Sequence, residues 1–243
     1  MTQSQINSVC SISIKNVSLR IGESLVLDNI SIEANERRIG IVGRNGSGKS
    51  TLARVLCGLV EPNEGEITVD EIDVVNDRVN AIKTVALLFQ NPDHQILFPT
   101  VEEELSFGLE QTGMSRGDAR MASHDMLANF SCKSWAEKSV SVLSQGQRHL
   151  VCLMTVLLMN PSLIVLDEPY AGLDIPTTAQ LKRHLDSVTA TIVHISHQAE
   201  VLADYDRVLW IDAGRLHMDG HPEKVLGAFV QRMNEIGAHD ALV

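Results

Sequence analysis

The chain has 243 residues, 44% of them hydrophobic, and a formal net charge of −11 at pH 7. This length and composition suffice for a full α/β core. The acidic balance opposes binding to a phosphate backbone, so no nucleic acid partner is expected. The polar N-terminus, Met1 to Ser8, lacks the apolar centre of a signal peptide, and the most apolar stretch, Leu150 to Met159, is too short to span a bilayer. We therefore expect a protein that stays in the cytoplasm and reaches a membrane only through partners.

The N-terminal region alternates apolar and polar residues, which predicts an antiparallel β edge beside a parallel core. The alternating segments are Ser11–Ile14, Val17–Ile21, Leu25–Leu27 and Ile67–Val69.

A glycine-rich loop follows the short apolar strand Arg38–Val42 and reads Gly43-Arg44-Asn45-Gly46-Ser47-Gly48-Lys49-Ser50-Thr51. Its glycines allow backbone N–H groups to surround an anion, and Lys49 is expected to reach the β- and γ-phosphates. Ser50 can offer its hydroxyl to Mg²⁺, and the helix that begins near Lys49 points its positive end at the phosphates. The strand before the loop and the apolar stripe after it disfavour a chance match. That stripe is Leu52, Val55, Leu56 and Leu59.

Residues from about 91 to 159 are predicted to be mainly helical. Gln90 follows the apolar strand Val85–Phe89, so its amide is expected at the edge of the sheet, within reach of the metal or the attacking water. Thr100 to Glu103 forms a capping box, with Val101, Leu105 and Leu109 on one helix face. A second helix starts at Ser115 with Ala122, Met126 and Phe130 on its face, and a third opens at Ser144-Gln145-Gly146-Gln147.

Two carboxylates end the buried strand that precedes them, in the sequence Leu163-Ile164-Val165-Leu166-Asp167-Glu168. Parallel α/β sheets bind ligands at this end of their strands. Adjacent strand residues point to opposite sides, so we expect Asp167 to order Mg²⁺ and Glu168 to polarise the water that attacks the γ-phosphate. His197 follows another strand and can hydrogen-bond that phosphate, whereas His194 on the same strand is expected to be a core or surface residue.

The C-terminal part is expected to contain a hairpin turn at Asp212 to Arg215 and a helix that opens at Pro222. The tail past Gln231 shows little periodicity, which predicts a segment that is loose or makes only a minor contact.

Six motifs in this order resemble those of an ABC transporter ATP-binding subunit. They are a Walker A loop at Gly43–Thr51, a Q-loop residue at Gln90, the signature at Leu143–Gln147, Walker B at Leu163–Glu168, a D-loop at Ala171–Asp174 and the switch histidine His197. The resemblance implies a P-loop NTPase fold of the α/β class, with a parallel core sheet, an antiparallel β edge and a helical subdomain. It implies one ATPase domain over residues 1–243, with the core and β subdomain at 1–90 and 160–243 and the helical subdomain at 91–159.

The resemblance also implies ATP and Mg²⁺ as cofactors and assigns the site residues. The catalytic set is Lys49, Gln90, Glu168 and His197; the metal set is Ser50, Gln90 and Asp167; the nucleotide contacts are Ile21, Gly43, Asn45, Gly46, Ser47, Gly48, Lys49, Ser50, Thr51, Ser144, Gly146, Gln147 and Asp174. Two positions depart from the common family pattern. Gln145 replaces a glycine of the signature. Ile21 stands where many relatives place the aromatic residue that stacks on adenine, so we expect aliphatic contact from Ile21, with the Arg20 guanidinium as a candidate second contact, and loose base selectivity.

The segment from Gln90 to Gly108 is similar to that of energy-coupling-factor (ECF) ATPases, which energise vitamin and transition-metal uptake. In that group the segment is implied to receive a helix of an integral membrane subunit; the alternative is that the face of Val101, Leu105 and Leu109 packs within its own subdomain. Within this group the chain most resembles the biotin-uptake ATPase subunit, which implies uptake of biotin. One alternative function is to energise uptake of cobalt or nickel. A less favoured alternative is a soluble ABC ATPase that takes no part in transport.

The family fold implies that the signature lies too far from Lys49 of its own chain to share one phosphate. The signature of one subunit is then expected to close over the γ-phosphate held by a second ATPase subunit, either another copy or a paralogue. A separate membrane subunit would bind the transported substrate and contact this chain only indirectly. We expect a peripheral location on the cytoplasmic face of the inner membrane.

Overall fold

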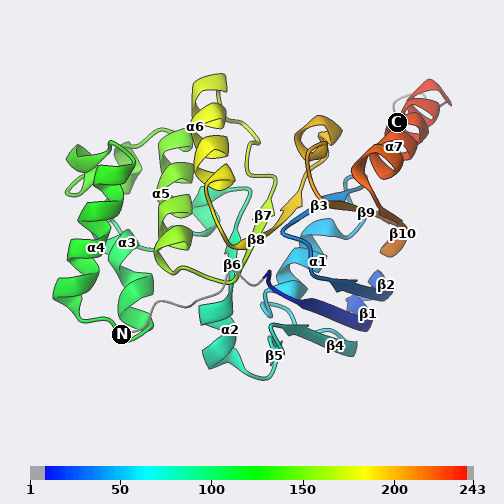
Figure 1. Cartoon of the computed structure of the whole chain (residues 1–243), viewed down its shortest axis with the longest axis horizontal. Helices are drawn as coiled ribbons and strands as arrows, with labels where there is room; N and C mark the ends of the chain where they lie inside the picture. Colours follow the sequence, from blue (N-terminus) through cyan, green and yellow to red (C-terminus); the bar gives the residue numbers. More distant parts are fainter. Residues whose placement is uncertain (1–8, 240–243) are drawn as a thin grey trace. The chain divides into compact units, whose positions relative to one another are not determined.

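The computed structural model describes residues 9–239, which divide into two compact units. Within the described residues, the first unit contains 9–87, 162–168 and 190–239, and the second contains 88–161 and 169–189. The segment 169–189 makes its contacts with the helical unit, although the sequence alone placed it with the core. The first unit combines strands and helices and the second is mainly helical, which agrees with the predicted α/β fold with a helical subdomain (Figure 1).

A six-stranded sheet forms the centre of the first unit, in the order β10-β9-β3-β8-β7-β6. The strands are β3 (Arg38–Val42), β6 (Val85–Leu88), β7 (Leu163–Asp167), β8 (Thr191–Ile195), β9 (Arg207–Asp212) and β10 (Arg215–Gly220). Strands β9, β3, β8 and β7 run parallel, and every residue of β7 and β8 is buried, as expected for strands covered on both faces. The carboxyl ends of β3, β8 and β7 therefore lie beside one another, at the edge where α/β sheets bind ligands.

The predicted antiparallel edge is a second sheet in the order β2-β1-β4-β5. Its strands are β1 (Ile12–Ile21), β2 (Ser24–Ala34), β4 (Glu64–Val69) and β5 (Ile72–Asp73). Helix α1 (Lys49–Leu56) packs against both sheets, because Ile14 of β1, Ile41 of β3 and Leu52 of α1 line one small apolar cavity. Leu59, expected on the buried stripe of α1, is 51% exposed because the helix ends earlier and Gly58 turns the chain with φ 64°.

Three further helical elements belong to the first unit: α2 (Arg78–Thr84), the 3₁₀ helix η4 (Ala199–Leu202) and α7 (Pro222–His239). The hairpin between β9 and β10 and the start of α7 at Pro222 confirm the sequence expectations. The prediction of a loose tail past Gln231 was wrong as far as His239, since α7 continues to that residue; Asp240 to Val243 lie outside the described residues. Helix α7 packs on Trp210 of β9 through Val225 and Phe229.

The second unit is built from α3 (Val101–Gln111), α4 (Arg116–Asn129), α5 (Gln145–Leu158) and α6 (Ile175–Asp186), with short 3₁₀ turns at Pro92–His94, Lys133–Trp135 and Val140–Val142. Thr100 caps α3 by accepting a hydrogen bond from Glu103 N, whereas the Glu103 carboxylate accepts from the Thr100 hydroxyl instead of completing a capping box. Val101, Leu105 and Leu109 are buried together on one face, as predicted.

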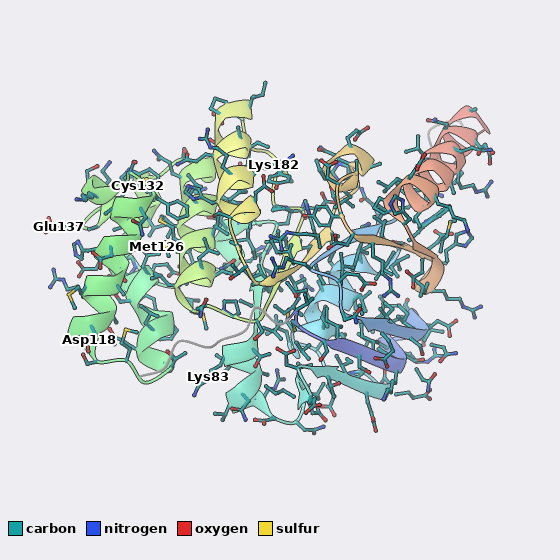
Figure 2. All side chains as sticks on the ribbon, viewed as in Figure 1. Lys83, Asp118, Met126, Cys132, Glu137 and Lys182 are labelled. Carbon is teal, nitrogen blue, oxygen red and sulfur yellow. The ribbon has the colours of Figure 1, made fainter. Side chains whose placement is uncertain are left out.

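The predicted buried face after Ser115 is confirmed at Phe130, which is buried at the end of α4, and is wrong at Ala122 and Met126. Within α4 the buried residues are Ala119, Ser123 and Leu127. Met126, which is labelled in Figure 2, is only partly buried. Ser123 was not predicted to be buried, because serine is a polar residue. In the structure its hydroxyl lies 3.1 Å from the Ser106 hydroxyl of α3. Each hydroxyl donates to a backbone carbonyl oxygen of its own helix, Ser106 to Glu102 O and Ser123 to Ala119 O, which removes the usual cost of burying them.

Candidate functional site

The glycine-rich loop joins β3 to the N-terminus of α1. Gly48 has φ 102°, and a Cβ there would lie 2.9 Å from Val26 O, so both conformation and space require glycine. Lys49 is buried, and its Nζ donates to the carbonyl oxygens of Gly43 and Arg44 at 2.8 Å each. Burial lowers the pKa of Lys49, and the charges of Glu168 and Asp167 oppose that shift. The ammonium is thus held across the mouth of the loop, at the start of a helix, where an anion is stabilised.

The hydroxyl of Ser47 indicates what this loop is built to hold. It is buried, and among residues 9–239 it has no hydrogen-bond partner. Buried hydroxyls normally have a partner, and a phosphate oxygen in the loop would supply one. The loop therefore fits a nucleotide phosphate.

A hydroxyl and a carboxylate meet beside this loop. Ser50 Oγ, on the first turn of α1, donates to Asp167 Oδ1 at the end of β7, at 3.1 Å. Asp167 is 8% exposed; burial raises its pKa, and the hydrogen bond from Ser50 works in the opposite direction. Both residues were predicted to hold Mg²⁺, and their oxygen atoms are the ligands that this ion prefers. The pair fits a magnesium ion that would also contact the phosphates.

Glu168 lies one residue further and turns to the neighbouring strand. Its backbone takes φ 50°, a left-handed conformation that is costly for a residue with a side chain, and its N–H donates to Ile195 O at 3.0 Å. Its Oε1 accepts from His197 N at 2.9 Å and lies 2.8 Å from His197 Nδ1, and Oε2 accepts from Ser196 Oγ at 3.5 Å. The predicted catalytic pair is therefore in direct contact. The contribution of Ser196 was missed by the sequence reasoning, because a serine at a strand end is common and carries no specific signal.

The remaining predicted residues of the first unit lie at its surface. Ile21 ends β1 beside the turn at Gly22, and it is 57% exposed, so its side chain is accessible to a ligand. Arg20 next to it is exposed and donates to Glu23 O at 3.4 Å. Asn45 and Gly46 form the tip of the glycine-rich loop, and Thr51 continues α1.

The other predicted site residues belong to the second unit. Gln90 lies two residues beyond the end of β6. Ser144 caps α5 in a complete capping box, since its hydroxyl accepts from Gln147 N and Gln147 Oε1 accepts from Ser144 N. The helix start thus keeps its geometry with glutamine at position 145.

Two glycines and an aspartate shape the neighbouring D-loop within the same unit. A Cβ on Gly146 would lie 3.1 Å from Thr177 Cγ2, and one on Gly172 would lie 3.3 Å from Gln145 Nε2. Asp174 caps α6 by accepting from Thr177 N at 2.8 Å. The signature and the D-loop therefore form one compact surface, whose N–H groups at α5 can receive an anion.

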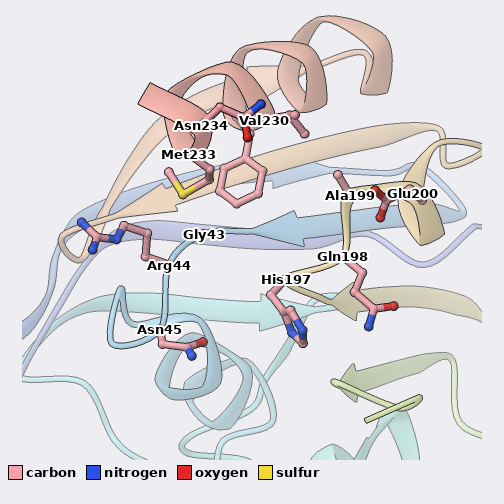
Figure 3. Close-up of a pocket in the computed structure, with 11 residues that line it drawn as sticks. Gly43, Arg44, Asn45, His197, Gln198, Ala199, Glu200, Val230, Met233 and Asn234 are labelled. Atoms are coloured by element: carbon pink, nitrogen blue, oxygen red, sulfur yellow. The ribbon is translucent and has the colours of Figure 1, made fainter. Parts of the chain in front are cut away.

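A pocket of about 550 Å³ adjoins the glycine-rich loop (Figure 3). The loop tip forms one wall with Arg44 and Asn45, and His197 to Glu200 form another. Helix α7 closes the third side with Phe229, Val230, Met233 and Asn234. The role of α7 was missed, although the apolar spacing of Val225, Phe229 and Met233 was a readable helical signal.

Comparison with known proteins agrees with this geometry. Residues 27–171 match the family described as ABC transporter. The chain is 42% identical over 225 residues to the biotin transport ATP-binding protein BioM of Rhodobacter capsulatus, covering 93% of this chain and 96% of that one. It is 31% identical to the protein of the same name from Rhizobium etli, covering 86% and 92% of the two chains.

Solved structures show the same fold. A dimeric ATP-binding cassette in a post-hydrolysis state with ADP and phosphate matches with a TM-score of 0.78 and 25% identity, over 87% of this chain and 98% of that one. CbiO1 of Clostridium perfringens, part of the ABC transporter complex CbiONQ, matches with a TM-score of 0.75 and 24% identity, over 96% and 95% of the two chains. The chain belongs to the ABC transporter family, as one of its ATP-hydrolysing subunits.

Proposed function

We propose that this ATPase energises uptake of a vitamin, with biotin as the substrate, through an ECF-type importer. The likeness to two biotin transport ATP-binding proteins over most of the chain supports this function. The observation that carries the chemistry is the convergence of Lys49, Ser50, Asp167, Glu168 and His197 at one edge of one sheet.

Each of these side chains has a distinct task in hydrolysis. Lys49 and the N-terminus of α1 bind the β- and γ-phosphates and offset their charge. Ser50 and Asp167 would hold Mg²⁺, which neutralises charge on the phosphates. Glu168 accepts a proton from the water whose oxygen attacks the γ-phosphorus, as the bond to the ADP oxygen breaks. His197 holds the Glu168 carboxylate through two hydrogen bonds. His197 would also hydrogen-bond the γ-phosphate, and Gln90 would contact the metal or the water.

The signature supplies the reason for a dimer. Ser144, Gly146 and Gln147 begin α5 with N–H groups at a helix N-terminus, a second anion site on the same chain. In our proposal this site closes over the γ-phosphate held by a second copy, and a two-fold axis completes both sites at once. The dimeric state of the similar cassette supports this arrangement.

The membrane partner is proposed to contact exposed apolar side chains near the start of α3. The predicted face of Val101, Leu105 and Leu109 is buried, so the alternative of packing within its own unit holds for those residues. Leu97 is 71% exposed, and Phe107 is 37% exposed with its ring 4.7 Å from that of Phe98. These side chains can receive an apolar helix of an integral membrane subunit. None of the helices in the described residues 9–239 could span a bilayer. Through contact with this membrane partner, we propose a peripheral location on the cytoplasmic face of the inner membrane.

Uptake by whole cells tests the substrate. Cells that express this chain together with the membrane proteins that copurify with it should accumulate labelled biotin. Glu168→Gln should abolish accumulation while the complex still copurifies. Accumulation of Co²⁺ or Ni²⁺ in place of biotin would replace the proposed substrate by the transition-metal alternative, and accumulation of neither would contradict the importer function.

A further inference from the structure

The segment that carries His197 is tied to the sheet through a buried histidine. Residues 196–206 leave the end of β8, form η4 and return to start β9. His194, near the end of β8, is 1% exposed and pairs in register with Gly40 of β3 and Leu166 of β7. Its Nδ1 lies 2.7 Å from the hydroxyl of Tyr205, near the other end of the segment. This hydrogen bond therefore joins β8, which leads into the segment, to Tyr205, which lies two residues before β9 begins.

Backbone hydrogen bonds to β3 hold both ends of this segment, and its middle is folded into η4. Ser196 N donates to Ile41 O at 3.1 Å, and Asp206 N donates to Arg38 O at 2.9 Å. Between them, Leu202 packs so closely on β3 that a Cβ on Gly40 would lie 3.0 Å from Leu202 Cδ1. The segment is thus seated on β3, with the bond between His194 and Tyr205 beneath it.

A histidine is an expensive choice for the centre of a parallel sheet, where isoleucine or valine would bury more apolar surface without a polar group. Burial lowers the pKa of His194 to about 3, so the imidazole stays neutral at all working pH values. A neutral imidazole and a phenol form a directional bond that an aliphatic residue could not make. What His194 adds to the core is therefore orientation of Tyr205 and of the segment that ends at it.

We propose that His194 and Tyr205 are positioning residues for ATP hydrolysis, which hold segment 196–206 so that His197 meets the Glu168 carboxylate. This rests on the proposed role of His197. Both hydrogen bonds from His197 to Glu168 Oε1 depend on where residue 197 lies, because one comes from its backbone N–H and the other from its ring. A misplacement of about 1 Å can lower turnover strongly. The loop at Gly43–Lys49 is a separate element, so nucleotide binding should be little affected.

The test compares steady-state ATPase kinetics of the full chain and three variants. Tyr205→Phe removes only the hydroxyl and keeps the ring packed against the core. It should lower kcat roughly 3- to 10-fold with little change in KM for ATP, as expected for loss of one orienting hydrogen bond. His194→Phe should lower kcat similarly, and the double variant should be no worse than either single one, because both changes remove the same bond. His194→Gln, which can still accept from the Tyr205 hydroxyl, should recover part of the loss.

Thr191→Val is the matched control on the same strand. The Thr191 hydroxyl accepts a hydrogen bond from Cys10 N at 3.0 Å and is also buried, but it lies at the opposite end of β8. The Thr191→Val variant should lower the melting temperature about as much as Tyr205→Phe does and should leave kcat unchanged. Unchanged kcat in Tyr205→Phe, or an equal loss of kcat in Thr191→Val, would overturn the positioning role. His197→Ala separates the two claims: if it abolishes turnover while Tyr205→Phe has no effect, only this inference fails.

Discussion

Glu168 Oε1 accepts a hydrogen bond from the backbone of His197 and lies 2.8 Å from the Nδ1 atom of its ring. The Glu168 side chain is 12% exposed and that of His197 is 54% exposed, so the carboxylate is sheltered while the imidazole still faces solvent. This arrangement joins the ends of β7 and β8 through one carboxylate oxygen. It leaves the base oriented but accessible to a water molecule.

Replacing Glu168 by glutamine should separate binding from hydrolysis. Glutamine keeps the size of the side chain and can still accept from His197 N, but it cannot take a proton from water. We expect turnover to fall by at least about 100-fold, in the range typical for loss of a general base, while ATP still binds. Phosphate release and nucleotide binding, measured in parallel, check this. Retained turnover would remove Glu168 from the role of base.

Replacing Ser50 by alanine should raise the Mg²⁺ concentration needed for activity. The change removes one oxygen ligand and the hydrogen bond to Asp167 Oδ1, so Asp167 would be left to hold the ion with water. Titration of ATPase activity with Mg²⁺ should show a half-saturation point shifted several-fold upward. The same variant should bind ATP without metal about as well as the parent chain, and an unchanged Mg²⁺ dependence would contradict the metal assignment.

The adenine contact can be tested at Ile21. An aromatic ring there can stack on the base, which is worth about 1–3 kcal/mol, so Ile21→Tyr should tighten ATP binding several-fold. Equilibrium binding of a fluorescent ATP analogue, displaced by ATP, measures the effect. Val79→Tyr is the control, since it adds the same ring to the exposed face of α2, and it should leave the affinity unchanged. Equal or weaker binding by Ile21→Tyr would remove Ile21 from the base site.

His149 should make the fold sensitive to acid. It is buried in α5, neither ring nitrogen has a hydrogen-bond partner among residues 9–239, and burial lowers its pKa to about 4. The unfolded chain binds a proton below about pH 6.5 and the folded chain only near pH 4, so the free energy of unfolding falls as the pH drops through this window. Urea titrations at pH 7 and pH 4.5 measure how much the free energy of unfolding decreases in acid. This decrease should be smaller in His149→Met than in the parent chain, by at most about 3 kcal/mol. An identical acid loss in both proteins would contradict the shifted pKa.

Lys49, Ser50, Asp167 and His197 could be placed from the sequence because parallel strands bring their carboxyl ends to one edge of a sheet. Strand patterns alone fix which residue ends a strand and leave the following turn undetermined. The left-handed turn at Glu168, which brings its carboxylate to His197, could therefore not be foreseen.

The buried face of α4 was misread for a different reason. Its apolar pattern is broken by Ser123, which is buried with its hydroxyl 3.1 Å from that of Ser106 on α3. Such pairing depends on which helices become neighbours, and local periodicity carries no information about it.

Mixing two inactive variants tests the shared site most directly. Lys49→Ala removes the phosphate contact and keeps the signature intact, whereas Ser144→Arg fills the signature and keeps Lys49 intact. In a symmetric dimer a 1:1 mixture forms mixed pairs in about half of the cases, each with one complete site, so activity should return to about a quarter of that of the parent chain. Each variant alone should be inactive while remaining folded by circular dichroism, and a mixture that stays as inactive as its components would contradict a site completed by two copies.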